Sequence, residues 1–210
     1  MSALERIAHF RNRRDEVPNQ ELARDLAAKK DRLGIREIAE NLWNKDKGIQ
    51  ADCVKVLYEV GYLNPQLVAG YAEEFVKLLK SRNNRLVWGG MIALGTVAQL
   101  KPEVVLEHLE EIKQTIQAGS VITVDNGVLA LARAASASPK VGKAVFPFLL
   151  DHLKTCRPKD VPQHSEKTLV AVNASNRATF VNVLKKRQAD LSGGGLARVK
   201  KVIRQAEARG

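Results

Sequence analysis

The segment LVWGGMIALGTVAQLKPEVVLEHLEEIKQTI, residues 86–116, has the pattern of two helices separated by a break at Pro102. Its first half is apolar on nearly all sides and uncharged as far as Leu100, which is typical of a helix covered by neighbours. In its second half, apolar residues such as Ile112 recur at helical spacing, with glutamates between them. The segment is therefore a predicted helical hairpin with a buried first helix.

The same hairpin recurs along the chain at a period of 37 residues. Pro65, Pro102 and Pro139 are separated by that interval, and one further step reaches Asn176. An inward-facing apolar side chain is expected ten residues after each proline, at Phe75, Ile112 and Leu149. Units of this length cannot bury their apolar faces alone and must stack. The sequence thus predicts an all-α protein, a right-handed α-α superhelix (solenoid) of about five hairpins.

The predicted helical-repeat domain covers residues 1–191, and residues 192–210 are expected to form a glycine hinge and a basic capping helix. The expected repeat units are residues 18–44, 47–81, 84–117, 120–155 and 159–190. Gly34 is expected to end the first helix of the first unit. Pro147 is expected to kink the second helix of the fourth unit or to delay its start.

Composition narrows the class of protein. The longest uncharged run, residues 86–100, is too short to span a bilayer, and the N-terminus lacks an apolar signal core. The only two cysteines, Cys53 and Cys156, lie in different repeats, which favours a reducing compartment over a disulfide framework. We therefore expect a cytoplasmic protein that does not associate with membranes.

Positive charge is concentrated toward the C-terminus. The formal net charge is +11, and residues 120–210 hold 16 basic but only 6 acidic side chains. Such asymmetry predicts an anionic partner, either nucleic acid or an acidic protein, although basic side chains also keep a terminal repeat soluble. The candidate partner-binding residues are the cations of the last two predicted helices: Lys185, Lys186, Arg187, Arg198, Lys200, Lys201 and Arg204.

Paired helices at this period, with an Ala-Leu-Gly segment at residues 93–95 that is echoed at residues 130–132, resemble HEAT or armadillo-type repeats over about residues 35–190. A HEAT helix usually carries an arginine about eight residues before that glycine. Here Val87 and Trp88 occupy the place, so an armadillo-like stack fits equally well. The resemblance implies a scaffold for other proteins. One bacterial HEAT-like branch, however, consists of glycosylases that remove alkylated bases from DNA.

His152, Cys156 and His164 have the spacing H-x3-C-x7-H, and the first two would share a helix face. A zinc site is not predicted here, because a fourth ligand is missing and Pro158 and Pro162 interrupt the segment. We accordingly expect no metal and no cofactor.

Asp125 and the two tryptophans are further candidates for a functional role. Asp125, beside Asn126, is the nearest candidate for a glycosylase carboxylate, but a helix dipole explains an acid in a first turn and no tryptophan lies within 30 residues. Trp43 and Trp88 are expected to pack in the core.

The sequence predicts a non-catalytic helical-repeat scaffold or adaptor that binds a macromolecular partner, with a protein as the favoured partner. The alternative is a nucleic-acid-binding protein that uses the basic C-terminal repeats, at its extreme an alkylated-base DNA glycosylase. No nucleophile–base pair is evident in the sequence, so catalysis is not predicted.

Overall fold

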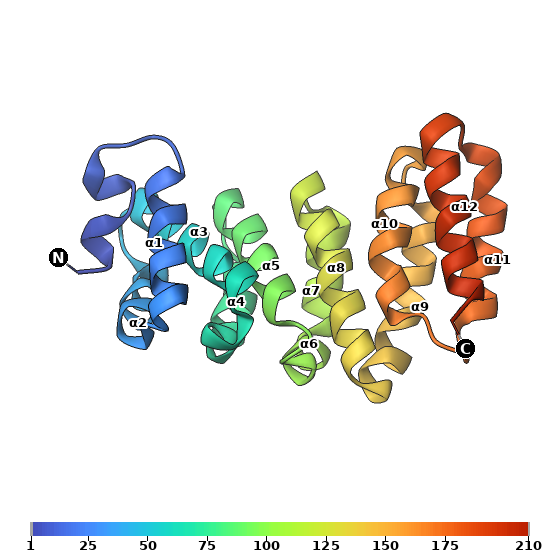
Figure 1. Cartoon of the computed structure of the whole chain (residues 1–210), viewed down its shortest axis with the longest axis horizontal. Coiled ribbons are helices and arrows are strands. Elements are labelled where there is room, and N and C mark those ends of the chain that lie inside the picture. Colours follow the sequence, from blue (N-terminus) through green and yellow to red (C-terminus); the bar gives the residue numbers. More distant parts are fainter. Residues whose placement is uncertain (1, 210) are drawn as a thin grey trace.

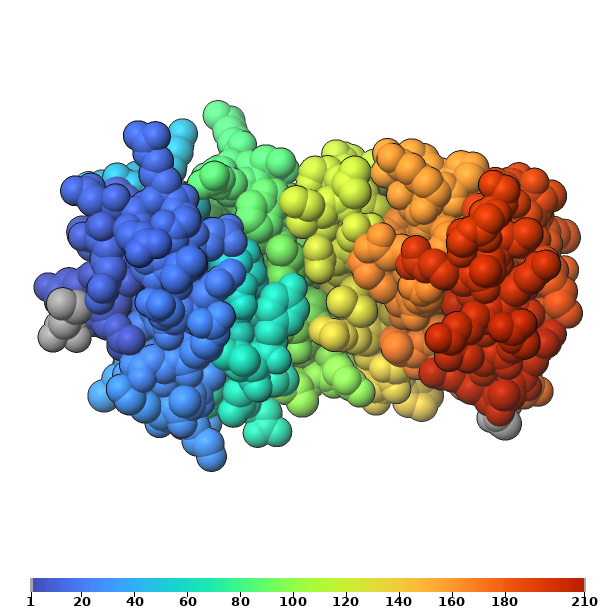
Figure 2. Space-filling view, turned by 45° about the horizontal axis from the view of Figure 1, so that its top comes forward, coloured from blue at the N-terminus to red at the C-terminus, as the bar shows by residue number. Residues whose placement is uncertain are grey.

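The computed structural model describes residues 2–209, which contain helices and connecting turns but no strand. The all-α class predicted from the sequence is confirmed. Twelve α-helices, α1 to α12, follow one another along an elongated molecule, with the two ends of the chain at opposite ends of the stack (Figure 1). Figure 2 shows the same progression on the surface. None of the helices in this part of the chain has the length and hydrophobicity needed to cross a bilayer.

The helices form two layers. In the first layer each helix packs on the next: α1 (Val17–Lys29), α3 (Lys47–Leu63), α5 (Asn84–Val97), α8 (Val121–Ala137), α10 (Val161–Thr168) and α12 (Gly193–Glu207). The second layer covers one side of the first and contains α2 (Arg32–Glu40), α4 (Ala72–Leu78), α6 (Pro102–Glu107), α7 (Leu109–Ala118), α9 (Pro139–Thr155) and α11 (Arg177–Arg187).

Short 3-10 helices join the α-helices. They are η1 (Leu4–Arg6), η2 (His9–Arg11), η3 (Asn41–Trp43), η4 (Pro65–Leu67), η5 (Ala69–Tyr71), η6 (Pro158–Asp160), η7 (Leu169–Ala171) and η8 (Gln188–Asp190). The periodic prolines all stand at the first residue of an element: Pro65 opens η4, Pro102 opens α6 and Pro139 opens α9. Proline suits this position, because the first N–H groups of a helix have no partner within it. The division into a repeat domain and a separate terminal segment stays a prediction.

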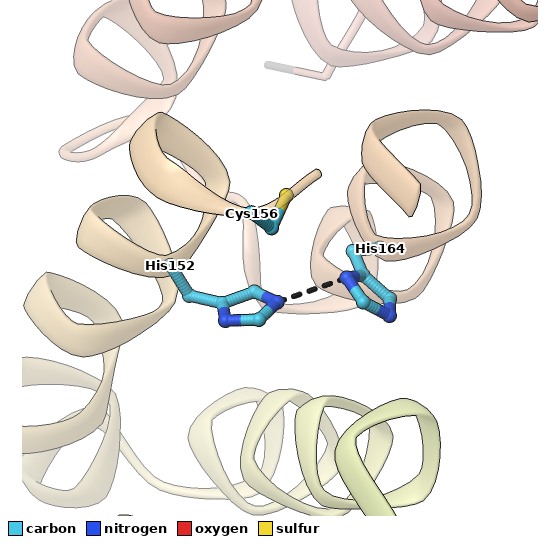
Figure 3. Close-up of side chains that lie close together, drawn as sticks. All are labelled: His152, Cys156 and His164. Atoms are coloured by element: carbon cyan, nitrogen blue, oxygen red, sulfur yellow. Dashed lines mark hydrogen bonds between the residues drawn. The ribbon is translucent and has the colours of Figure 1, made fainter. Parts of the chain in front are cut away.

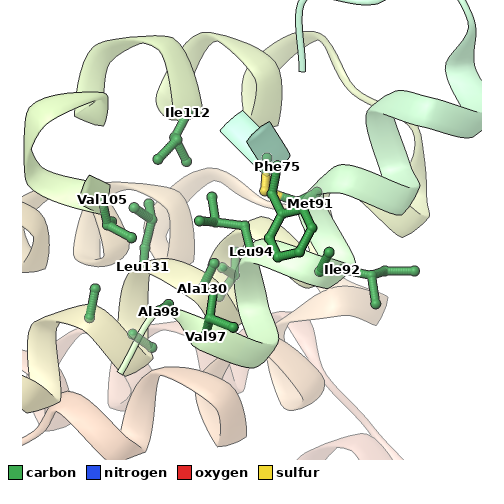
Figure 4. Close-up of a cluster of buried hydrophobic side chains, with 14 of the residues drawn as sticks. Phe75, Met91, Ile92, Leu94, Val97, Ala98, Val105, Ile112, Ala130 and Leu131 are labelled. Carbon is green, nitrogen blue, oxygen red and sulfur yellow. The ribbon is translucent and has the colours of Figure 1, made fainter. Parts of the chain in front are cut away.

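The core lies between the two layers. The inward positions predicted from the period, Phe75, Ile112 and Leu149, are fully buried. Figure 4 shows Phe75 of α4 beside Met91 and Leu94 of α5. Ile112 of α7 comes from the same repeat as α5, and Leu131 of α8 comes from the next repeat. Each hairpin therefore fills the gap left by its neighbour, as stacked repeats require. Truncating such a side chain to alanine costs roughly 2–5 kcal/mol.

Gly34 does not end a helix, contrary to the prediction. Helix α1 ends at Lys29, where Lys30 adopts the left-handed conformation with φ 52°, and Gly34 lies buried inside α2. A Cβ atom at Gly34 would lie 2.6 Å from Cδ2 of Leu26 in α1. The glycine is therefore required for the close approach of α1 and α2.

The expected glycine hinge is absent, and of the two effects expected of Pro147 the delayed start of the helix is excluded. Gly193, Gly194 and Gly195 do not form a hinge but the first turn of α12, where Gly193 has φ 50° and Gly195 lies against Pro162 of α10. Packing on a neighbour thus overrides the weak helix propensity of glycine. Pro147 does not delay α9, which starts at Pro139 and runs through it.

Candidate functional site

The N-terminal ends of α1, α3 and α5 border a hollow of about 390 Å³ in the first layer. Its lining includes Arg14, Asp52, Lys55, Arg85 and Trp88, and we call it the α1–α3–α5 hollow. A second hollow of about 700 Å³ shares Arg85 with it and extends along the loops before α3 and α5. The two hollows together form an extended depression across three neighbouring repeats.

Lys55 anchors the α1–α3–α5 hollow. Its ammonium lies 2.7 Å from Glu16 at the start of α1 and 2.7 Å from Glu59 one turn further along α3, and its side chain is only 11% exposed. Burial opposes the charged form, but the hydrogen bonds to both carboxylates outweigh it and raise the pKa of Lys55. Lys55 is therefore committed to the fold and is not available to a partner.

Aromatic rings continue from this lysine across the layer. The Lys55 ammonium lies 4.8 Å from the centroid of the Tyr58 ring, which in turn packs on Trp88 of α5 at 6.5 Å and on Tyr62 at 5.9 Å. Such separations are those of cation–π and aromatic pairs. Trp88 is half-buried and packs against the core, whereas Tyr62 is 55% exposed. The partly exposed rings of Trp88 and Tyr62 are thus held in place by the buried Tyr58 ring between them.

Four exposed cations surround this depression: Arg14, Lys47, Arg82 and Arg85. Over residues 2–209 none of the four forms an ion pair. The nearby carboxylates are already engaged, since Asp46 accepts from the N–H groups of Gly48 and Ile49 at the start of α3. Asp52 likewise accepts from His9 and Asn19. The depression therefore presents unpaired positive charge beside helix N-termini, which favour anions.

The cations predicted from the sequence behave differently. Arg187 is buried and donates from Nη1 to the Leu153 carbonyl at 2.6 Å and from Nη2 to the Cys156 carbonyl at 2.8 Å, while its Nε donates to Asp190. It thus fastens the end of α9 to α11. Its position among exposed lysines concealed this role, although Phe180, Leu184 and Arg187 share one helix stripe.

Two more of the predicted cations are engaged within the protein. Arg198 makes a two-point contact with Glu166 of α10 at 2.6 and 2.8 Å, and Lys185 pairs with Glu207 at 3.0 Å. The remaining predicted residues, all exposed and without an ion pair in the described chain, are Lys186, Lys200, Lys201 and Arg204. Lys186 lies on α11 and the other three lie on α12. The structure thus divides the predicted patch.

Trp43 is not in the core, contrary to the prediction. The regular helix α2 ends before it, so Trp43 falls in η3 with half of its surface exposed. Its indole Nε1 donates to Glu74 of α4 at 2.7 Å. Trp43 therefore lies on the second layer, away from Trp88 on the first.

A separate hollow of about 540 Å³ lies between α7, α8, α9 and α10, and His152, Cys156 and His164 line it. The sequence predicts no zinc site at these three residues, because a fourth ligand is missing and Pro158 and Pro162 intervene. In the structure Pro158 opens η6 and Pro162 lies in the first turn of α10, so the prolines make the tight return that brings α10 back beside α9. Figure 3 shows the rings of His152 and His164 facing each other, with Cys156 beside them.

Hydrogen bonds define this His–Cys cluster. His164 is 1% exposed, and its Nε2–H donates to Oδ1 of Asp125 at 2.7 Å. Its Nδ1 is then the acceptor for Nε2–H of His152, at 2.9 Å. Asp125 also accepts from Gln163 at its other carboxylate oxygen. Asp125 is thus not a free glycosylase carboxylate, and the first-turn position expected from the sequence is wrong, since α8 starts at Val121 and has no acid in its first turn.

The protonation of the cluster follows from its burial. Burial, with the neighbouring His164 second, lowers the pKa of His152 to about 4, so this ring is neutral at physiological pH. Burial raises the pKa of the Cys156 thiol, against the opposing influence of Arg187. One sequence signal could have indicated the buried histidine: His164 falls on the inner stripe of α10 with Val161 and Thr168.

No protein-family model matches the sequence, and no curated protein matches it. Solved structures do match the fold over nearly the whole chain. An engineered protein is 18% identical, with 99% of this chain and 98% of that chain covered, at a TM-score of 0.66. A designed armadillo repeat protein in complex with the peptide (KR)4 is 14% identical, with 97% of each chain covered, at a TM-score of 0.66.

A third structure, titled as computationally designed armadillo repeat proteins for modular peptide recognition, is 14% identical and covers 91% of this chain and 94% of its own, at a TM-score of 0.63. At these identities the likeness concerns the fold alone. Three observations indicate the same kind of fold: the two layers of helices, the periodic prolines at the starts of helical elements, and the similar solved structures. The chain has an armadillo/HEAT-like helical-repeat fold.

Proposed function

We propose that this protein is a non-catalytic scaffold or adaptor that binds an acidic segment of a partner protein in the α1–α3–α5 hollow and along the loops before α3 and α5. The observation that carries the proposal is the set of four exposed cations without ion pairs beside half-buried Trp88. Unpaired cations attract an anionic segment and increase its rate of association. A tryptophan with a supported ring is a common anchor in interfaces.

The shape of the site supports a peptide-like ligand. The depression crosses three successive first-layer helices, so an extended chain laid across it would meet side chains from each repeat in turn. Two of the similar solved structures are of designed armadillo repeat proteins, one in complex with the peptide (KR)4 and one made for peptide recognition. This chain carries positive charge at the proposed site, so the partner segment should carry the opposite charge to (KR)4.

The C-terminal cations keep a separate role in the proposal. Lys186, Lys200, Lys201 and Arg204 remain candidates for contact with an anionic partner, including nucleic acid as the alternative function. We give them second place because no aromatic residue follows Phe180. The two unpaired cysteines suit the cytoplasm, which we propose as the location.

A selection of random displayed peptides on the purified protein tests this function. The proposal predicts enrichment of acidic peptides that contain a large apolar residue. Binding of a labelled selected peptide should weaken as salt is added. Trp88→Ala should reduce its affinity about tenfold, because hot-spot side chains contribute more than about 1 kcal/mol.

Trp43→Ala is the matched control, since it removes the same side chain from the other layer, and it should leave affinity unchanged. Enrichment of basic peptides, or equal losses for the two tryptophan variants, would contradict the proposal. Binding of DNA or RNA that is lost when Lys200 and Lys201 become glutamine would favour the nucleic-acid alternative instead.

A further inference from the structure

The His–Cys cluster has the composition of a metal site that the proposed binding function does not use. One ligand atom from each of His152, Cys156 and His164 lies within 4.8 Å of the other two. His152 stands in the last turn of α9, Cys156 follows one turn later as the residue that ends the helix, and His164 comes from α10. Two elements thus converge on one point.

We infer that Nε2 of His152, Sγ of Cys156 and Nδ1 of His164 bind a single divalent transition-metal ion, with zinc as the best match. Two imidazoles and one thiolate are the donors that zinc prefers, at about 2.0–2.1 Å for nitrogen and about 2.3 Å for sulfur. Tetrahedral coordination would place the two nitrogens roughly 3.3 Å apart. They now lie 2.9 Å apart, so the rings need to separate by only a few tenths of an ångström.

The surroundings of His164 are those of a metal ligand. Metal-binding histidines usually donate their other ring N–H to a carboxylate, which fixes the tautomer and the orientation of the ring. Nε2–H of His164 makes this bond to Asp125, so its Nδ1 lone pair is directed at the cluster. Gln163 donates to the other oxygen of Asp125, and Lys167 donates to its backbone carbonyl at 2.7 Å. Asp125 is therefore itself held at its second carboxylate oxygen and at its backbone carbonyl.

Binding can be written with its protons. His152 transfers the proton on Nε2 to Nδ1 through solvent and remains neutral, which frees the Nε2 lone pair. The Cys156 thiol loses its proton to solvent and ligates as thiolate. The guanidinium of Arg187, bonded to the Cys156 carbonyl, favours that thiolate. One proton is therefore released for each metal ion bound, and no electron is transferred.

Three protein ligands leave one coordination position for a water molecule. The adjoining hollow has room for it, with about 540 Å³ bordered by apolar Val121, Val124 and Phe148. Three ligands with an open fourth position distinguish reactive zinc sites from closed structural ones. A second group of potential ligands, Glu73, Glu107 and His108, lies nearer the surface, where His108 already pairs with Glu73. Nδ1 of His108 also lies 4.0 Å from Glu111, so both of its ring nitrogens already face carboxylates, and this group serves as the control.

The test uses the whole 210-residue chain, reduced and treated with a chelator. Cobalt(II) is titrated first, because a thiolate ligand gives a charge-transfer absorption in the near ultraviolet that histidine and carboxylate ligands do not. Zinc is then titrated by calorimetry in two buffers of different ionisation enthalpy. We expect one equivalent of metal, the thiolate absorption and release of one proton.

Four variants locate the site. Cys156→Ser should abolish the charge-transfer absorption, and His152→Ala should weaken cobalt binding at least tenfold. Asp125→Asn should weaken it by about 10–100-fold while the thiolate absorption remains, because this carboxylate acts through His164. His108→Ala should change nothing. Circular dichroism confirms that each variant is folded, and His152 and Cys156 are chosen since both are only partly buried.

The inference is overturned if the folded wild type binds no cobalt at a tenfold excess, or if one-equivalent binding survives both Cys156→Ser and His152→Ala. Peptide binding at the α1–α3–α5 hollow is measured on the same variants. It should be unaffected, so a failure of the metal site and a failure of the proposed function are separate results.

Discussion

The two ends of the molecule use positive charge in different ways. The C-terminal helices α11 and α12 hold the cations that the sequence emphasises, yet Arg187 is buried and Lys185 and Arg198 are paired within the protein. Of the seven predicted cations, those that stay exposed without an ion pair in the described chain are only Lys186, Lys200, Lys201 and Arg204. The region around the α1–α3–α5 hollow belongs to segments that are nearly neutral in sum, yet four of its cations are exposed without ion pairs. Net charge along a sequence thus does not report which charges a partner can reach.

The largest expected effect is on stability and concerns Arg187. Arg187→Met keeps the aliphatic stem but leaves the carbonyls of Leu153 and Cys156 and the carboxylate of Asp190 without their donor. We expect the free energy of unfolding to fall by about 2–4 kcal/mol. Urea denaturation at neutral pH measures it.

Lys186→Met at the neighbouring, exposed position removes the same charge and should change stability by less than about 0.5 kcal/mol. Similar losses for both variants would mean that Arg187 is not fixed in the manner described. The difference between buried, structural cations and exposed ones at the C-terminal end would then not hold.

The second effect concerns the metal site at the C-terminal half. Asp125→Asn should reduce zinc affinity by about 10–100-fold, equivalent to roughly 1.4–2.7 kcal/mol, because the amide no longer fixes the tautomer of His164. Competition with a chromogenic zinc chelator measures the change. An affinity equal to that of the wild type would show that Asp125 does not orient the ring.

The third effect concerns Tyr62, which lies near the end of α3 and is connected to Trp88 of the α1–α3–α5 hollow through the Tyr58 ring. Tyr62→Ala removes an exposed ring that packs on Tyr58, so the affinity for a selected peptide should fall severalfold, by about 0.5–1.5 kcal/mol. Fluorescence anisotropy of the labelled peptide measures it. Leu63→Ala, at an adjacent exposed position of α3, is the control. A larger loss of affinity for Leu63→Ala would mean that the peptide contacts Leu63 and not Tyr62 at the end of α3.

The smallest effect concerns the ion pair between Arg198 and Glu166. Both side chains are about half exposed, so Arg198→Gln should lower stability by less than about 1 kcal/mol despite the short contact. The hydrogen bonds from Arg198 lower the pKa of Glu166, so its stabilisation is present above the ordinary pKa of glutamate and is lost on acidification. Urea denaturation at pH 7 and in acid tests this, and a loss above 2 kcal/mol would contradict it.

The fold could be read from the sequence because it depends on periodic features. Pro65, Pro102 and Pro139 each start an element, and the apolar residues ten positions later are buried, so the period reports the packing directly. Single glycines predicted helix ends less well than the period predicted packing. Gly34 serves a close helix approach and not a helix end, a distinction that depends on a residue in another helix.

Most of the two candidate sites could not be predicted from the sequence, because each site combines residues from elements far apart in the chain. Asp125 binds His164, which lies 39 positions later in the sequence, and the α1–α3–α5 hollow is lined by residues of three helices. Pro158 and Pro162 interrupt the helical pattern in the sequence, and in the structure they form the turn that closes the His–Cys cluster. Periodicity could have helped in one respect, since His164 and Arg187 both fall on the inner stripes of their helices, and polar residues at such positions have specific partners.

The most direct measurement compares two triple variants of equal charge change. One replaces Lys47, Arg82 and Arg85 with glutamine, and the other replaces Lys200, Lys201 and Arg204. Fluorescence anisotropy with a selected acidic peptide, at low and physiological salt, gives the affinity of each. We predict a loss of more than tenfold for the first variant and less than threefold for the second, as local and not total charge decides binding. Equal losses, or a greater loss for the second, would contradict this assignment.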